Sequence, residues 1–158
     1  MCKILVLCVL AVTLLVFSHG APTENTARQL ELLRVVGIDL HRMKQASKII
    51  SEEFYTITDT GSRDIKCRIS ALCCFVRELY DLEKYLRNLP EYAVYTNNTI
   101  INAVEFLKQL DASYSEKTKA VQYLEDQCEI CDAPTTTKNI EGFVEDFEAL
   151  LKNLATNL

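Results

Sequence analysis

The cysteines are the residues of this chain whose type and spacing could do chemistry, because its 158 residues include only two histidines. Seven cysteines are present, at positions 2, 8, 67, 73, 74, 128 and 131. They could form a thiol–disulfide redox centre at Cys128-Glu-Ile-Cys131, a four-cysteine zinc site, or structural disulfides. The choice among the three depends on whether the chain folds in a reducing or an oxidising compartment.

The first twenty residues are typical of a secretory leader. A continuous apolar run, Ile4–Phe17, follows a single charge, and the small residues Ser18 and Gly20 stand where a signal peptidase would need them. The run is shorter than the roughly 20 residues that cross a bilayer. A buried N-terminal core helix is the alternative, but apolarity on every side of the helix disfavours it. We therefore expect residues 1–20 to be a signal peptide and residues 21–158 to be one secreted, extracellular domain.

Secretion favours disulfides over the two other kinds of cysteine site. Thiols outside the cell are normally oxidised, and the redox motif lacks the strand-then-helix context that it needs. On a helical wheel Cys67 and Cys74 share the outer face of one helix, whereas Cys73 falls on the core side. We expect bridges from Cys67 to Cys128 and from Cys74 to Cys131, with Cys73 as a buried free thiol. Removal of the leader takes away Cys2 and Cys8 and leaves five cysteines. These five allow other pairings, including one that uses Cys73 in place of Cys74.

Charge and composition argue against several classes of function. The net charge is −5 and Lys and Arg form no run, which disfavours nucleic acid or an anionic membrane surface as a partner. Once the leader is removed, His41 is the one histidine left, so no Ser–His or Cys–His pair can be named for nucleophilic catalysis. We expect no enzymatic activity, no cofactor, no metal and no insertion into a membrane.

Four amphipathic helices are expected to position these residues, because apolar residues recur three and four apart and almost nowhere alternate. We expect helices over 25–50 and about 64–88, a third that begins after Asn97-Asn98 and weakens at 111–115 before another turn or two over 116–127, and a fourth after a cap region at 135–137. The residues expected to point inward are, in chain order, Leu33, Val36, Leu40, Met43 and Ile50; Ile69, Leu72, Val76, Leu79, Leu82 and Leu86; Ile100, Val104 and Leu107; and Ile140, Phe143, Val144, Phe147, Leu150, Leu151 and Leu154.

The connections between these helices predict their arrangement. Residues 54–64 form a long connection with one short extended piece, and a second long connection precedes the fourth helix. Pro90 ends the second helix, so the link to the third is shorter. Long links let successive helices run in the same direction. The predicted fold is all-α: a short-chain four-helix bundle with up-up-down-down topology and two long crossover connections.

Four motifs of the chain are CRISALCC at 67–74, CEIC at 128–131, KNI at 138–140 and FYT at 54–56. Through them the chain resembles the short-chain four-helix cytokines of the interleukin-2, interleukin-15 and interleukin-21 family, most closely the interleukin-15 branch. The resemblance covers nearly all of residues 21–158. The Ala21-Pro-Thr start is closer to interleukin-2, so an interleukin-2 or interleukin-21 type of cytokine is the alternative within the family.

The resemblance implies a secreted, monomeric cytokine that assembles cell-surface receptor chains, so that attached kinases and STAT proteins signal to lymphocytes and support their growth and activation. It also implies the two disulfides given above. Carried over by position, the receptor-contacting residues are Asp39 and Asn102 for the shared β chain, Tyr55, Glu78 and Asp132 for the private α chain, and Lys152 for the common γ chain.

Each of these assignments has an alternative. Asp39 is otherwise the solvated flank of an apolar stripe. The family carries Gln where this chain has Lys152, and a cation cannot replace the paired donor and acceptor of an amide, which weakens the expectation of common γ binding. We expect Tyr55, Glu78 and Asp132 to form an acidic patch together with Glu125, Asp126 and Glu129, which would steer a basic receptor module.

Two further alternatives stay open. Asn97-Asn98-Thr99 is the one N-glycosylation sequon of the sequence, and Asn97 is either glycosylated or simply a helix cap. A secreted helical carrier of a small apolar ligand is the alternative from another class of function. Such a carrier needs an enclosed apolar cavity, whereas each helix here has one apolar stripe, sufficient to fill a shared core.

Overall fold

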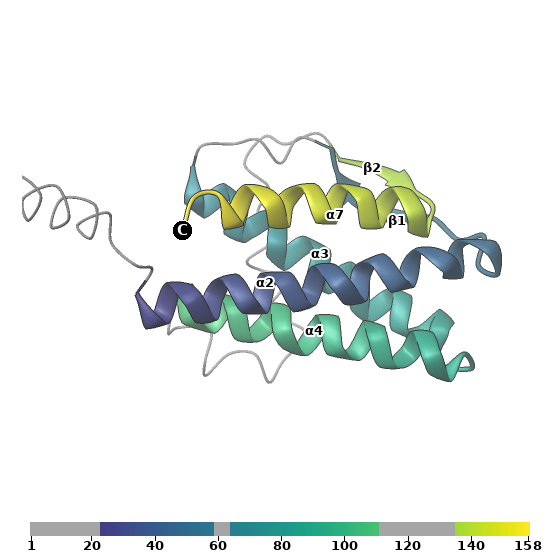
Figure 1. Cartoon of the computed structure of the whole chain (residues 1–158). Coiled ribbons are helices and arrows are strands. Elements are labelled where there is room, and N and C mark those ends of the chain that lie inside the picture. Colours follow the sequence, from purple (N-terminus) through teal and green to yellow (C-terminus); the bar gives the residue numbers. More distant parts are fainter. Residues whose placement is uncertain (1–22, 59–63, 111–134) are drawn as a thin grey trace, which may run out of the picture.

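The structure is a computed structural model that describes residues 23–58, 64–110 and 135–158. Its helices are α2 (Glu24–Met43), α3 (Ile65–Leu86), α4 (Pro90–Leu110) and α7 (Ile140–Ala155), with a 3-10 turn, η1 (Lys44–Lys48), after α2. Two short strands, β1 (Phe54–Ile57) and β2 (Thr135–Lys138), lie in the long connections. Figure 1 shows the long helices packed side by side with the strands near the start of α7. The prediction of a mainly helical chain is confirmed. The predicted signal peptide at 1–20 lies outside the described residues.

Side-chain caps explain where three of the helices begin. The Thr23 side chain accepts a hydrogen bond from the Thr26 amide at the start of α2. Asp64 does the same for α3, accepting from the Lys66 amide at 2.8 Å. Asn139 accepts from the Gly142 amide at 3.0 Å and starts α7. These bonds satisfy amides that have no partner within the helix.

The predicted start of the third helix is wrong. Helix α4 begins at Pro90, seven residues before Asn97. Proline cannot continue a helix, but at the first helical position its missing amide costs nothing and its fixed φ suits the helix. Pro90 therefore opens α4 directly after the turn that ends α3. As a result Asn97 and Asn98 lie within the helix rather than at its cap.

The apolar stripes of the helices meet in one core. All seven residues predicted for the fourth helix are buried, and so are the five predicted for the first. Ile69 and Val104 were predicted to point inward but are only partly buried. Aromatic rings join α3 to α7: the Phe75 and Phe147 rings stack with centroids 4.6 Å apart.

The two strands pair with each other although they are far apart in sequence. The pairing is antiparallel, with Phe54 opposite Lys138 and Ile57 opposite Thr135. Threonine favours strands, which explains why residues 135–137 form β2 and not the predicted cap region. A hydrogen bond of 2.9 Å from the Thr56 hydroxyl to the Asp146 carboxylate ties β1 to α7.

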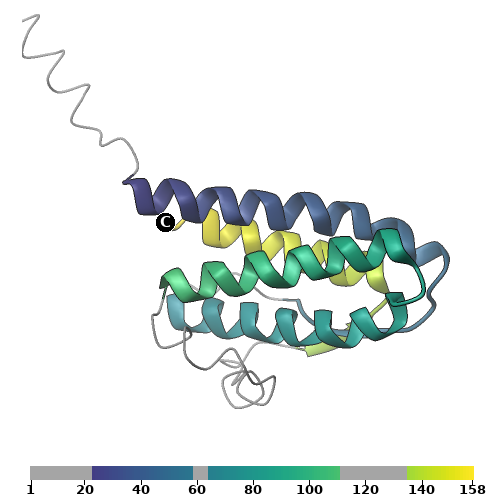
Figure 2. The ribbon, with the colours of Figure 1, turned by 90° about the horizontal axis from the view of Figure 1, so that it is seen from below.

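The neighbours of each helix follow from these contacts. Helix α4 lies between α2 and α3 when the molecule is seen from below, and it packs against both of them (Figure 2). Helix α7 packs against α2, α3 and the strands. Among the described residues, no helix has the length and apolar character needed to span a membrane.

Candidate functional site

Asp39 of α2 is buried, although an acid at a binding surface would be expected to be open to solvent. The residue is only 5% exposed. Arg42, one turn further along α2, donates to the Asp39 carboxylate at 3.4 Å and extends over the Tyr95 ring of α4, 5.2 Å from its centroid. Burial raises the pKa of Asp39, and the charge of Arg42 works in the opposite direction. The alternative of a solvated Asp39 is wrong, because the residue is buried and paired with Arg42.

Asn102 lies on the same side of α4 as Tyr95. The two residues are seven apart, which at about 100° per residue leaves them roughly 20° apart around the helix. Asn102 is half-buried. The pair Arg28–Glu105, at 3.2 Å, links the same two helices further along. We call the surface formed by Asp39, Arg42, Tyr95 and Asn102 the α2/α4 face.

Arg42 and Tyr95 are the residues of this face that were not predicted. The signal for Arg42 was available, because an acid and a base three apart on a helix are neighbours. No signal in the sequence identifies Tyr95, because its position depends on how α4 packs against α2.

Glu78 lies beneath β1 and not on an exposed surface. Its side chain is 8% exposed and accepts a hydrogen bond from the backbone amide of Tyr55 at 3.1 Å. Burial raises the pKa of Glu78, while this bond and the neighbouring Arg77 partly offset the rise. The prediction that Glu78 contributes to an exposed acidic patch is wrong, because β1 covers that side of α3. The Tyr55 residue itself is 62% exposed.

The residues around Tyr55 form a surface with mixed charge. A depression between β1 and α3 is lined by Glu53 just before β1, by Tyr55 of β1, and by residues of α3 that include Arg77, Asp81, Lys84 and Tyr85. The described lining contains the acids Glu53 and Asp81 and the bases Arg77 and Lys84, so this part of the surface does not carry charge of one sign. Asp132, Glu125, Asp126 and Glu129 lie outside the described residues. We call the surface formed by Tyr55, Arg77 and Tyr85 the β1/α3 face.

The cysteines of α3 occupy three different environments. Cys67 is partly buried and disulfide-bonded. Cys73 is fully buried in the core, on the side where it was predicted. Cys74 is 5% exposed and lines a cavity of about 210 Å³ beneath β1, so its predicted place on an open outer face is wrong. Cys128 and Cys131 lie outside the described residues, and the pairing stays a prediction.

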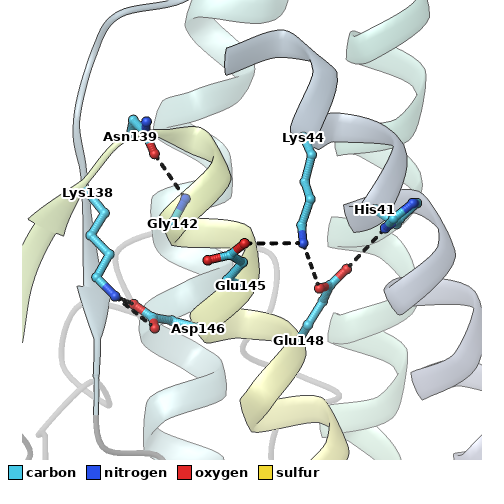
Figure 3. A network of polar contacts seen from close by, with 8 residues as sticks. All are labelled: His41, Lys44, Lys138, Asn139, Gly142, Glu145, Asp146 and Glu148. Atoms are coloured by element: carbon cyan, nitrogen blue, oxygen red, sulfur yellow. Dashed lines mark hydrogen bonds and ion pairs between the residues drawn. The ribbon is translucent and has the colours of Figure 1, made fainter. Parts of the chain in front are cut away.

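The polar side of α7 lies against the end of α2 and the start of η1, where Lys44 forms ion pairs and His41 approaches a carboxylate (Figure 3). Lys44 lies 3.1 Å from Glu148 and 3.8 Å from Glu145, and His41 lies 3.8 Å from Glu148. Lys152, one turn beyond Glu148, is exposed. It lines a groove of about 360 Å³ between α2 and α7, together with Leu30, Leu33, Gly37 and Leu151. We call this the α2/α7 groove.

Two other kinds of result bear on function. No group of three or more His, Cys, Asp or Glu side chains in residues 23–58, 64–110 and 135–158 could hold a metal ion. No protein-family model, curated protein or solved structure matches the chain. The family expected from the sequence motifs therefore stays a prediction.

Proposed function

We propose that the chain is a secreted cytokine of the interleukin-15 type, folded as a short-chain up-up-down-down bundle, that acts by bringing receptor chains together. The observation that carries the proposal is the pairing of β1 with β2. In an up-up-down-down bundle the first crossover returns along α2 and the second returns along α4. The two crossovers therefore run in opposite directions, as the antiparallel pairing requires. The short link between Leu86 and Pro90 favours antiparallel α3 and α4.

The three surfaces described above suit three receptor chains. The α2/α4 face, with Asp39 and Asn102, would contact the shared β chain. The β1/α3 face would contact the private α chain through Tyr55, together with Asp132. Glu78 would contribute to this contact only indirectly, because its hydrogen bond from the Tyr55 amide holds the strand that carries the tyrosine.

The α2/α7 groove would receive the common γ chain, with Lys152 at its rim. The groove has apolar walls from both helices, and interface cores are typically apolar with a polar rim. Lys152 changes the polar part of this contact from an amide to a cation. A γ chain that binds here would therefore need an acceptor opposite Lys152.

The proposal is tested by measuring binding of the secreted chain to immobilised ectodomains of the three receptor chains. The variants D39N, Y55A and K152E should each weaken binding to one ectodomain, the β, α and γ chain respectively. Glu24→Gln is the matched control, because Glu24 is an exposed acid at the start of the same helix as Asp39. A chain that is folded and secreted but binds none of the three ectodomains would overturn the proposal.

A further inference from the structure

The outer side of α4 carries an apolar stripe with the sequon of the chain at its centre. Val94 and Ile101 are each 55% exposed. Asn97, three residues after Val94 and four before Ile101, is also exposed. These spacings place the three side chains on one face of the helix. A bulky, solubilising glycan on Asn97 would therefore lie next to both exposed apolar side chains.

Thr99, the hydroxyl residue of the sequon, points the other way. It is fully buried, and its hydroxyl donates to the Tyr95 carbonyl at 2.8 Å. Two residues apart on a helix, Asn97 and Thr99 are about 200° apart around the axis. Enzymatic transfer of an N-glycan needs access to both the amide and the hydroxyl of the sequon. The folded helix exposes the amide and buries the hydroxyl.

We propose that Asn97 is N-glycosylated before α4 folds, and that the glycan then covers Val94 and Ile101. In this transfer the Asn97 side-chain nitrogen bonds to the anomeric carbon of a lipid-pyrophosphate-linked oligosaccharide. The bond from that carbon to the lipid pyrophosphate breaks, the pyrophosphate leaves with its negative charge, and the amide loses one proton to solvent. The inference rests on the secretion that is part of the proposed function.

The position of the glycan would decide which surfaces of α4 remain open. Asn97 and Asn102 are five residues apart, which places them about 140° apart around the helix. A glycan on Asn97 therefore covers the outer side of α4 and leaves the α2/α4 face free. The apolar stripe of Val94 and Ile101 is then not a protein-binding surface.

The first experiment tests attachment. The full chain is expressed in mammalian cells, once with its own residues 1–20 and once with an established secretory leader in their place. Wild type should carry one glycan that peptide N-glycosidase removes, and N97Q and T99V should both lose it. N98Q is the matched control, because it changes a neighbouring amide and keeps the sequon. Secreted wild type without a glycan would overturn the inference. If the chain stays inside the cell with its own residues 1–20 but is secreted and glycosylated with the established leader, only the proposed secretion is overturned.

The second experiment tests the order of the two events. Unglycosylated chain is produced in bacteria and divided into a folded sample and a sample unfolded in urea and then diluted. Each sample is mixed with microsomal oligosaccharyltransferase and its lipid-linked oligosaccharide donor. The unfolded chain should be modified at Asn97 and the folded chain should not. Equal modification of both would refute the order that the buried Thr99 implies.

The third experiment tests the covering. At equal thermal stability, N97Q should bind more of an apolar dye and self-associate more than glycosylated wild type. Adding V94S and I101S to N97Q should return dye binding to the wild-type level. Equal dye binding by wild type and N97Q would show that the glycan does not cover the stripe.

Discussion

The hydrogen bond between Tyr55 and Glu78 determines how the first connection is held against α3. The Tyr55 amide donates to a Glu78 carboxylate oxygen at 3.1 Å. Strand β1 has β2 along one edge, and this amide leaves from the edge that faces α3. Glu78 therefore takes the place of a neighbouring strand at an edge that would otherwise keep a polar group without a partner.

Replacing Glu78 by alanine should destabilise the protein, whereas replacing it by glutamine should not. A hydrogen bond to a charged group contributes roughly 1.5–3 kcal/mol. Because the side chain is only 8% exposed, solvent does not screen this bond appreciably. Glu78→Ala should lower the free energy of unfolding by about that amount. Glu78→Gln keeps an acceptor oxygen and removes a buried charge, so its free energy of unfolding should stay within about 1 kcal/mol of wild type.

Two measurements separate these effects. Urea unfolding of residues 21–158 gives the free energy of unfolding, and hydrogen exchange at the Tyr55 amide reports on the bond itself. In Glu78→Ala this amide should exchange roughly 10- to 150-fold faster than in wild type, the factor that 1.5–3 kcal/mol gives. A loss of stability in Glu78→Gln as large as in Glu78→Ala would mean that the charge, and not the acceptor, matters. Unchanged exchange in Glu78→Ala would refute the bond.

Four other predictions concern two glycines, the titration of Glu78, receptor binding by Asp39 and the cysteine pairing. Gly37→Ala should stabilise the protein by about 0.5–1 kcal/mol, because the new Cβ would make an ordinary contact 4.0 Å from Leu151. Gly142→Ala should destabilise it by about 1–3 kcal/mol, because the new Cβ would lie 2.8 Å from Cδ and 3.0 Å from Cβ of Lys138. Thermal unfolding of the two variants and wild type tests both predictions. Burial raises the pKa of Glu78, so the folded protein binds a proton there more tightly than the unfolded chain does. Wild type should therefore lose stability relative to Glu78→Gln as the pH rises from the usual pKa of 4.5 through the raised pKa. Unfolding free energies of the two proteins that change in parallel with pH would contradict this. Asp39→Asn should weaken binding to the β-chain ectodomain by about 1.5–3 kcal/mol without preventing folding, and unchanged affinity would show that Asp39 serves only to hold Arg42. Peptide mapping of the secreted protein should find Cys67 linked to Cys128 and Cys74 to Cys131, and a bridge that uses Cys73 would contradict the pairing.

The helix periodicity predicted the core well where the stripe is wide and regular. All seven inward residues of α7 follow from spacings of three and one, and each is buried. The same holds for α2 from Leu33 to Met43. At these positions burial is decided by the helix period alone, since any partner must cover the apolar side.

Predictions that depended on one residue with two structural roles were less successful. Pro90 can follow the end of one helix or open the next, and here it opens α4. The three threonines before Lys138 suit a cap region or a strand, and the pairing with β1 selects the strand. In both cases the choice depends on contacts made by residues that are distant in the sequence.

Cys74 and Glu78 show why a helical wheel cannot by itself identify a binding surface. The wheel places both on the side of α3 opposite its core stripe, and that side was expected to be open. In the structure β1 lies across it, so Cys74 is 5% exposed and Glu78 is 6% exposed. A wheel gives the direction in which a side chain leaves the helix, but not which segment packs over it. Glu78 consequently stabilises the first connection. Tyr55, the exposed residue that we propose for contact with the private α chain, lies on the strand and not on the helix.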